Sequence, residues 1–489
     1  MKVLFTHSYF LKFDSKQFNA GTPYPPLGTI YAASYLREKG YDVYLHDIQF
    51  ETDPTEINKS LEKIKPDVFV IYDDGFNYLT KMCLTNMRNA AYKMQQFAKA
   101  YHCKVIVSSS DSTDHVEEYL KNGADYIIKG EAEQTLLELI DYLSGKETIE
   151  LNKINGITYF ENNQVVNTAN RTVLKDLDQL PLPAWDLIDI EPYKKMWQNK
   201  NGYFSINMVT TRGCPYKCNW CAKPIYGNRY NTHSPESIVA QIELLQQKFK
   251  FDHIWFADDI FGLKPGWLKS FANEIRDKKI KIKYKIQSRA DLLLEENTIE
   301  LLAQSGCEVV WMGAESGSQK ILDAMDKGIR VEQIFEATRL LKKHSIKPAF
   351  FLQFGYPTET IEDIKLTINM VNNLLPNDIG ISVSYPLPGT KFYESVKQEL
   401  KTKTNWTDSD ELALMFHNTY KPEFYKQLHR LIHKSYRKHQ SLDMLSKLFK
   451  GNYKETNLKR IIAYPYYYIG AVKEKRKLKL IESDAAAGL

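Results

Sequence analysis

The sequence predicts an α/β protein in which two units of alternating strands and helices are followed by a helical segment. Short apolar runs alternate with amphipathic stretches over residues 1–145, and the same alternation returns over residues 204–388. Beyond residue 395 the apolar and aromatic residues have helical spacing. The composition, with 43% hydrophobic and 26% charged residues, is that of an ordinary globular protein.

The first unit, residues 1–148, is expected to form a parallel sheet. Its apolar runs are separated by helical stretches such as Gly28–Lys39 and Thr113–Asn122, which favours helices on both faces of the sheet. This pattern predicts a flavodoxin-like or Rossmann-like doubly wound domain, in which ligands bind at the carboxyl ends of the strands. The expected strands are Lys2–Thr6, Asp42–His46, Asp67–Tyr72, Lys104–Ser108 and Tyr126–Lys129.

Residues 149–198 have a different character and are expected to connect the two units. The runs Ile154–Tyr159 and Gln164–Val166 predict a small hairpin. The segment Leu180–Asp186 is rich in proline, which is typical of a linker.

The second unit, residues 199–395, repeats the strand–helix alternation about six times, with helical stretches such as Pro235–Gln247 and Val331–His344. Repeated units of this kind predict a partial (β/α)6 TIM-like barrel, whose chemistry takes place on loops at the carboxyl ends of the strands. The expected strands are Phe204–Thr210, His253–Ala257, Ile282–Ser288, Glu308–Gly313, Ala349–Gly355 and Ile379–Tyr385.

The C-terminal region, residues 396–489, is predicted to be helical and basic. The net charge of the whole chain is +5, whereas residues 421–480 alone carry 16 Lys and Arg against 4 Asp and Glu. Such a segment suits an anionic substrate, a membrane surface or nucleic acid, and a solvated helical face explains it equally well.

Cysteine usage and the first residues indicate a reducing compartment. Three of the six cysteines lie in one loop, and the other three, Cys83, Cys103 and Cys307, are scattered without a pairing pattern. No basic stretch followed by a long apolar core opens the chain, and no run reaches the ~18 apolar residues of a membrane span. We therefore expect a cytoplasmic protein without a transmembrane segment.

The loop Cys214-Pro-Tyr-Lys-Cys218-Asn-Trp-Cys221 is the most informative motif of the chain. Three thiolates from one loop can hold three irons of a cubane cluster and leave the fourth iron open to a small molecule, whereas clusters that only carry electrons usually have four cysteines. The alternative is a zinc site with His233 as the fourth ligand, or a disulfide. The absence of a second Cys-x-x-Cys pair and the spacing of the three cysteines argue against zinc.

Polar or glycine-rich residues follow each of the later strands of the second unit. An acidic pair or a Pro-Gly-Thr sequence alone indicates only a helix cap or a turn. At the same end of successive strands, however, these residues are expected to line one cavity, in which an arginine, a glutamate and hydroxyl groups could hold a zwitterion with a carboxylate and an amine. The segments are Trp255–Phe261, Gln287–Asp291, Met312–Ser318, Gln353–Thr360 and Tyr385–Tyr393.

These motifs together resemble the radical S-adenosylmethionine (SAM) enzymes, and in particular the branch with an N-terminal cobalamin (B12)-binding-type domain. The spacing of the three cysteines, with Trp220 before the last, is similar to the signature of that superfamily. The resemblance covers roughly residues 1–395. Further matching segments are Pro25–Arg37, Lys129–Glu133, Asp176–Pro183, Ser288–Asp291, Gly313–Gly317 and Pro386–Thr390.

The resemblance implies roles for particular residues. Cys214, Cys218 and Cys221 would bind a [4Fe–4S] cluster, whose open iron would take the amine and carboxylate of SAM. Reduction would cleave SAM to a 5′-deoxyadenosyl radical, with the difficult chemistry carried by the cofactors. By similarity, the residues that contact SAM would be Trp220, Ser288, Arg289, Glu315, Ser316 and Gly355, and those that contact cobalamin would be Leu27, Gly28, Ser108, Ser109 and Gly130.

The chain departs from the family pattern at the cobalamin site. The Asp-x-His-x-x-Gly motif is absent, the third strand leads into Tyr72–Asn77 instead of a Ser/Thr-rich loop, and the fourth leads into Ser108–Ser112 instead of a Gly-Gly pair. The alternative is a flavodoxin-like domain kept for packing or substrate capture. The extra cysteines of methylthiolating relatives and of enzymes with auxiliary clusters are also absent, so one cluster is expected.

The function that the resemblance implies is cobalamin-dependent methylation of a carbon centre in a small or lipid-like metabolite. A radical cyclisation, rearrangement or oxidation without methyl transfer is the alternative within the family. The third hypothesis is a nucleic-acid-binding protein that uses the basic C-terminus, which the lack of any RNA-binding motif disfavours. The expected partners are a small-molecule or lipid-like substrate and an electron donor such as flavodoxin or ferredoxin, with peripheral membrane contact through the basic end.

Overall fold

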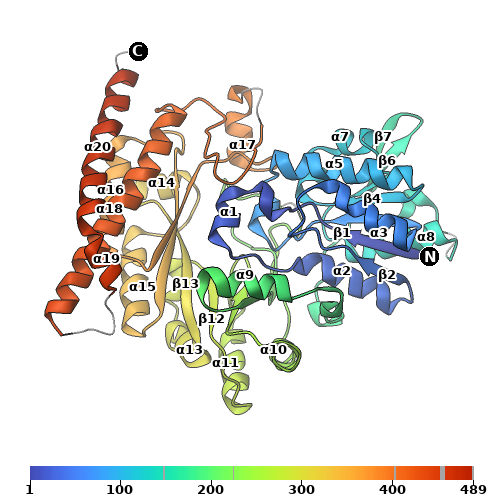
Figure 1. The fold of residues 1–489 in the computed structure, drawn as a ribbon, viewed down its shortest axis with the longest axis horizontal. Helices are drawn as coiled ribbons and strands as arrows, with labels where there is room; N and C mark the ends of the chain where they lie inside the picture. Colours follow the sequence, from blue (N-terminus) through green and yellow to red (C-terminus); the bar gives the residue numbers. More distant parts are fainter. Residues whose placement is uncertain (147–148, 224, 401–403, 452–456, 487–489) are drawn as a thin grey trace.

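The computed structural model describes residues 1–489 except 147–148, 224, 401–403, 452–456 and 487–489. Within the described residues it contains two mainly parallel sheets and a C-terminal helical hairpin, which follow one another across the molecule (Figure 1). The predicted fold class is confirmed.

The first sheet has seven strands in the order β2-β1-β3-β4-β5-β6-β7. The strands β1 to β5 pair in parallel, as expected, and the hairpin β6–β7 continues the sheet because β6 pairs antiparallel with β5. The strands are β1 (Lys2–Thr6), β2 (Asp42–Leu45), β3 (Val68–Tyr72), β4 (Lys104–Ser108), β5 (Tyr126–Ile128), β6 (Ile157–Glu161) and β7 (Gln164–Asn167).

Helices cover both faces of this sheet. Successive strand residues point to opposite faces: Val3 and Phe5 pack with α2 and α8, whereas Leu4 packs in the core that includes α5. The expected helix Thr113–Asn122 is divided at His115, because Ser109 and Ser112 form a capping box that starts a short helix earlier. The helices are α1 (Ser15–Ala20), α2 (Leu27–Glu38), α3 (Ile57–Ile64), α4 (Tyr78–Lys81), α5 (Thr85–Ala100), α6 (Ser110–Asp114), α7 (Val116–Lys121) and α8 (Glu133–Ser144).

The second sheet has six parallel strands in the order β15-β14-β13-β12-β11-β8, and its two outer strands do not pair with each other. It is the partial barrel that the sequence predicts. A short antiparallel pair, β9 (Thr211–Arg212) and β10 (Asn231–Thr232), flanks it. The six strands are β8 (Ser205–Met208), β11 (His253–Phe256), β12 (Tyr284–Ser288), β13 (Cys307–Glu315), β14 (Lys347–Phe354) and β15 (Asp378–Val383).

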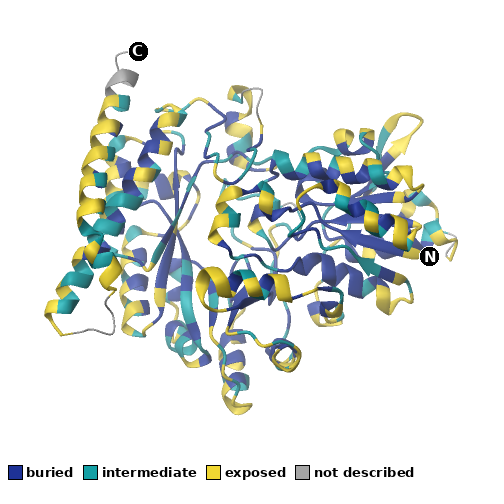
Figure 2. Ribbon diagram, in the orientation of Figure 1, coloured by how far each residue is buried: buried dark blue, intermediate teal, exposed yellow. Residues whose placement is uncertain are grey.

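The helices of the second half surround this sheet and extend to the far edge of the molecule (Figure 1). Figure 2 shows that the strands of both sheets are mostly buried, whereas the last helix is mostly exposed. No helix in the described ranges combines the length and apolarity that a membrane span requires. The helices are α9 (Glu191–Asn201), α10 (Pro235–Lys248), α11 (Trp267–Asp277), α12 (Ala290–Leu293), α13 (Thr298–Ser305), α14 (Gln319–Ala324), α15 (Val331–Lys343), α16 (Ile361–Leu374), α17 (Lys391–Val396), α18 (Pro422–Phe449), α19 (Leu458–Ile462) and α20 (Tyr464–Ala486).

Candidate functional site

The cysteine loop follows β8 and β9, at the carboxyl end of the barrel sheet. It begins at Gly213, which has φ +82° and whose absent Cβ would lie 2.4 Å from the Arg229 carbonyl oxygen. Only glycine fits this position without displacing backbone. Cys214 is buried, Cys218 and Cys221 are half-buried, and all three thiols are free.

Burial disfavours the charged form of these thiols. It raises the pKa of Cys214 and raises that of Cys221 to about 11, although the ammonium group of Lys223 lowers both values. Among the described residues, no three His, Cys, Asp or Glu side chains are gathered so that they could hold a metal ion. His233, the fourth ligand of the zinc alternative, lies with Nδ1 3.1 Å from Asp178 Oδ1, and its ring stacks against Tyr31.

Asn219, inside the cysteine motif, fixes the loop to the barrel. Its backbone N–H donates to the Met325 carbonyl (3.1 Å) and its side-chain amide donates to the Ala324 carbonyl (2.6 Å). Its side-chain oxygen accepts a hydrogen bond from the Tyr356 hydroxyl at 3.0 Å, and its carbonyl accepts one from the Phe392 N–H at 3.0 Å. Sequence reasoning gave Asn219 no role, because nothing in the spacing of the cysteines indicates these distant partners.

Arg289 lies beside the loop, directly after β12. Its guanidinium stacks on the Tyr216 ring, 3.7 Å from the ring centroid, and Nη1 lies 3.9 Å from the Cys218 sulfur. Asp291 and the Lys327 carbonyl accept its other hydrogen bonds at 2.9 Å. Arg289 is therefore held by residues of the loop, of α12 (Ala290–Leu293) and of the segment after α14 (Gln319–Ala324), with one edge toward the cysteines. Ser288 is the buried last residue of β12.

Glu315, at the end of β13, forms a buried ion pair with Lys327, with 2.9 Å between Oε1 and Nζ. Glu315 has φ +54°, a left-handed conformation that is uncommon for residues other than glycine. Lys327 Nζ also lies 6.0 Å from the Trp220 ring centroid, so this pair reaches the cysteine loop. Lys327 was not expected from the sequence, where it is one lysine among many.

Of the other predicted SAM-contacting residues, Trp220 has an unpaired hydrogen-bond donor, whereas the hydroxyl group of Ser316 is already hydrogen-bonded within the protein. The Trp220 indole N–H is buried and has no hydrogen-bond partner among the described residues, so it is free to meet a ligand. The Ser316 hydroxyl lies 3.1 Å from the Thr367 hydroxyl and accepts from the Ser318 N–H at 3.1 Å, which points it into the protein.

Gly355, at the end of β14, has φ +73° and lies against a buried carboxyl group. Its N–H donates to Glu359 Oε2 at 2.6 Å, while the second oxygen of Glu359 has no partner among the described residues. Burial raises the pKa of Glu359 to about 8. Glu359 is thus mostly protonated at neutral pH.

The acidic pair after β11 serves two different contacts. Asp258 accepts hydrogen bonds from the Thr210 N–H (2.7 Å), the Thr210 hydroxyl (2.6 Å) and the Thr211 N–H (2.9 Å), and burial raises its pKa to about 7. Asp259 instead forms an ion pair, 2.8 Å long, with Lys81 of α4. One aspartate therefore supports the strand before the cysteines, and the other reaches a helix of the first unit.

Arg212 joins the two halves of the chain directly before the cysteine loop. It is 3% exposed and forms ion pairs with Glu131 and with Glu133, the latter at 2.7 Å. The rings of Tyr31, Phe76 and Tyr226 surround its guanidinium at 5.3–5.8 Å. The sequence showed Lys129–Glu133 as a motif without a partner, and the structure supplies that partner.

The predicted cobalamin-contacting residues lie along the carboxyl edge of the first sheet. The N–H groups of Leu27 and Gly28 donate to Asp74 at 3.2 and 3.0 Å, so a buried carboxylate occupies the start of α2. Ser109 caps α6, and Ser108 accepts the Asp73 N–H through its carbonyl at 3.0 Å. Gly130 has φ +76° and faces the Ile225 carbonyl of the second half, 3.6 Å from the position of an added Cβ.

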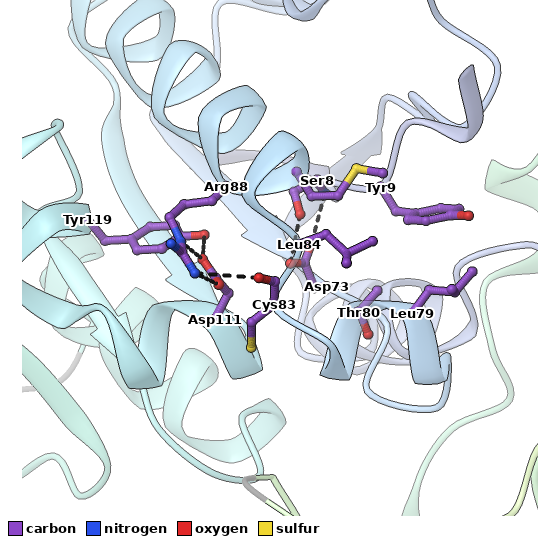
Figure 3. A pocket seen from close by; sticks show the side chains of 11 residues that line it. Ser8, Tyr9, Asp73, Leu79, Thr80, Cys83, Leu84, Arg88, Asp111 and Tyr119 are labelled. Carbon is purple, nitrogen blue, oxygen red and sulfur yellow. Dashed lines mark hydrogen bonds and ion pairs between the residues drawn. The ribbon is translucent and has the colours of Figure 1, made fainter. Parts of the chain in front are cut away.

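A small crevice lies where the strand order reverses, between β1 and β3 (Figure 3). Its volume is about 10 Å³, roughly the room of one water molecule. Asp73 accepts hydrogen bonds from the Ser8 N–H (2.7 Å) and hydroxyl (2.8 Å) on one side. On the other side Asp111 pairs with Arg88 and accepts from the Tyr119 hydroxyl at 2.8 Å. Leu79, Thr80, Cys83 and Leu84 close it.

These residues fit the cofactors to different degrees. The three thiols of the loop are not gathered around one point in this structure, but their number and donor type suit a cluster with one open iron. Arg289, the Glu315–Lys327 pair and the unpartnered Trp220 N–H suit a zwitterion that carries an aromatic base. At the first sheet, Gly28, Gly130, Ser108 and Ser109 are small residues that allow the close approach of a ring. The closed crevice has donors for a polar group, yet its volume does not admit a nucleotide.

Comparison with known proteins identifies two domains. Residues 208–371 match the radical SAM superfamily, and residues 18–140 match the B12 binding domain. The chain carries a radical SAM domain behind an N-terminal B12-binding domain. The protein is an enzyme, and the two domains imply the [4Fe–4S] cluster, SAM and cobalamin as cofactors.

The curated relatives of this radical SAM enzyme include methyltransferases and cyclases. It is 28% identical over 426 residues to an uncharacterized methyltransferase of Pyrococcus horikoshii, covering 85% of this chain and 88% of the relative. It is 24% identical to the anaerobic magnesium-protoporphyrin IX monomethyl ester cyclase of Rubrivivax gelatinosus, covering 82% and 71%. It is also 24% identical to the hopanoid C-3 methylase of Methylococcus capsulatus, covering 85% and 77%.

Solved structures share the fold. The cobalamin-dependent SAM radical enzyme OxsB with aqua-cobalamin bound aligns with a TM-score of 0.70 at 19% identity, covering 99% of this chain and 75% of OxsB. The radical SAM methyltransferase TsrM of Kitasatospora setae aligns with a TM-score of 0.68 at 18% identity, covering 81% and 76%.

Proposed function

We propose that this radical SAM enzyme methylates a carbon centre of a small or lipid-like molecule in a cobalamin-dependent reaction. The observation that carries the proposal is the contact between the first unit, which holds the predicted cobalamin residues, and the end of the barrel that holds the cysteine loop. Arg212 binds the start of the cysteine loop to Glu131 and Glu133 of the first unit, and Lys81 binds Asp259 across the same boundary. A group held on the first sheet would thus face a group held by the cysteines.

The chain's own residues supply position, charge and exclusion of water. When bound, the cofactors would supply the 5′-deoxyadenosyl radical and the methyl group. Arg289 and Lys327 would place positive charge beside a carboxylate, and Trp220 would offer its indole N–H to a base. The Asn219 hydrogen bonds would keep the loop in one conformation while the ligand changes charge.

The proposal also includes the residue roles, the domain bounds and the cellular compartment that the sequence predicts. It takes residues 1–148, 149–198, 199–395 and 396–489 as the units of the chain. Six free cysteines support a cytoplasmic, reducing environment. The electron would come from a donor such as flavodoxin or ferredoxin.

Radical cyclisation without methyl transfer is the second candidate, since a cyclase is among the relatives that the chain matches over most of its length. The two candidates differ in their by-products. Methyl transfer converts SAM to S-adenosylhomocysteine, whereas radical initiation converts SAM to 5′-deoxyadenosine.

The test is anaerobic reconstitution with iron, sulfide and hydroxocobalamin, followed by chromatography of the SAM products under reducing conditions. We expect both S-adenosylhomocysteine and 5′-deoxyadenosine, and neither from the variant with Cys214, Cys218 and Cys221 all changed to Ala. If 5′-deoxyadenosine forms without S-adenosylhomocysteine, the cyclase alternative replaces methylation. If the triple variant forms as much 5′-deoxyadenosine as the wild type, the cysteine assignment is wrong.

A further inference from the structure

The C-terminal helices form a hairpin on the opposite side of the barrel from the first sheet (Figure 1). The helix α20 packs along α18. Ala471 and Leu478 of α20 are buried. Figure 2 shows that the other side of α20 is exposed over most of its length. Lys434 of α18 lies at the edge of this side, with Nζ 3.7 Å from the Tyr466 ring centroid.

The exposed side of α19 and α20 carries large apolar residues. Leu458 is 62% exposed, Ile462 78%, Tyr466 64%, Ile469 65% and Leu480 66%. From Ile462 onward the spacing is that of one helical face. Single exposed apolar residues are ordinary on protein surfaces, but a contiguous group marks an interaction site.

The same side of α20 is basic. Five exposed bases lie between residues 473 and 479, namely Lys473, Lys475, Arg476, Lys477 and Lys479. Lys473, Arg476 and Lys477 share the face of Ile469 and Leu480, and the other two lie beside that face. The one acid in this stretch, Glu474, faces α18, where Gln427 Nε2 donates to its carbonyl at 3.0 Å and to its carboxylate at 2.5 Å. Lys477 Nζ lies 4.0 Å from that carboxylate, at the limit of an ion pair.

A shallow groove of about 390 Å³ runs along this face between Tyr468 and Leu480. Apolar Ile469, Val472 and Leu480 line it together with Lys473, Arg476 and Lys477. An apolar floor flanked by cations matches a molecule with an apolar chain and an anionic head.

We propose that the exposed face of α19 and α20 binds a lipid bilayer that contains anionic phospholipids. Helices with apolar and aromatic residues next to Lys and Arg lie in the membrane interface, and each base near an anionic surface adds to the affinity. A second copy of this chain fits the face poorly, because Lys473, Arg476 and Lys477 of one copy would face the same bases of the other. This inference does not depend on the proposed reaction.

The test uses the full-length chain and sedimentation with lipid vesicles. Phosphatidylcholine vesicles are compared with vesicles in which part of the phosphatidylcholine is replaced by phosphatidylglycerol. We expect the wild type to sediment with the anionic vesicles and to stay in solution with the neutral ones. Added salt should weaken the binding, because part of it is electrostatic.

Two variants and a matched control separate the contributions. The variant Lys473→Gln/Arg476→Gln/Lys477→Gln should lower partitioning roughly 100-fold. The control Lys264→Gln/Lys269→Gln/Lys279→Gln removes the same charge from exposed positions around α11 and should bind as the wild type does. The variant Ile462→Ser/Ile469→Ser/Leu480→Ser should also lose binding, and its unfolding transition should be unchanged because these side chains are exposed.

Several results would overturn the proposal. One is a wild type that stays in solution with anionic vesicles, and another is a charge variant that binds no worse than the control. Tighter retention on single-stranded RNA than on vesicles, lost in the charge variant, would replace the bilayer with nucleic acid as the partner. Sedimentation of a stable dimer that the apolar variant disrupts would replace it with a second copy.

Discussion

Removing the Arg212 guanidinium tests whether the two halves of the enzyme depend on one buried charge. In Arg212→Met the side chain keeps much of its length, and the rings of Tyr31, Phe76 and Tyr226 still surround an apolar group. Glu131 and Glu133, however, lose their cation while remaining buried. Leaving a buried charge without its partner costs about 3–5 kcal/mol, so the free energy of unfolding should fall by this amount.

The loss should depend on pH in a defined direction. Burial already raises the pKa of Glu131, and the Arg212 charge opposes that shift. Without Arg212 the pKa of Glu131 rises further above its unfolded value. A carboxyl group with a raised folded pKa contributes its stability below the unfolded pKa and loses it as the pH rises through the folded pKa. The deficit of Arg212→Met should therefore be smaller at pH 5 than at pH 8.

The assay is urea unfolding of both proteins at the two pH values. The matched control is Arg37→Met, which breaks the Arg37–Asp186 pair, 2.6 Å long with side chains 40% and 51% exposed. This exposed pair should contribute less than ~1 kcal/mol. The reasoning is refuted if Arg212→Met costs no more than Arg37→Met, or if its deficit shrinks as the pH rises.

Three further predictions concern the loop, the buried carboxyl group and the crevice. Gly213→Ala should lower the iron content after reconstitution, because its Cβ meets a carbonyl at 2.4 Å, whereas Gly227→Ala meets nothing within 4 Å; equal iron in both would contradict this. Because Glu359 keeps its proton in the folded protein up to about pH 8 but releases it near its ordinary pKa when unfolded, the wild type should lose up to about 1.4 kcal/mol of stability per pH unit between about pH 5 and pH 8, and Glu359→Gln should not; parallel curves over this range would exclude the raised pKa. Bound cobalamin should increase backbone hydrogen exchange in Tyr78–Lys81, because the nucleotide of cobalamin can enter the crevice only if the crevice opens. Cobinamide lacks the nucleotide and should leave the exchange unchanged. If exchange is also unchanged with bound cobalamin, the crevice stays closed.

The sequence by itself determined the fold class and the family. Strand and helix periodicity is local, so runs such as Lys2–Thr6 and Lys104–Ser108 became strands with the expected limits. The three cysteines lie within eight residues, so their spacing carries chemical information without any knowledge of the fold. The limits of helices were predicted less well: the capping box at Ser109 starts a short helix, so the predicted helix Thr113–Asn122 is divided into two.

Only the tertiary structure decided which distant residues meet. Arg212 lies 81 residues from Glu131, and no periodicity links them. Lys327 joins Glu315 and Trp220 because separate strand ends converge at one edge of the barrel. The direction of Glu474 toward α18, which leaves Lys473, Arg476 and Lys477 together on the exposed face, likewise depends on how two helices pack. Local patterns fix elements and motifs, whereas ion pairs between elements depend on packing that no short segment contains.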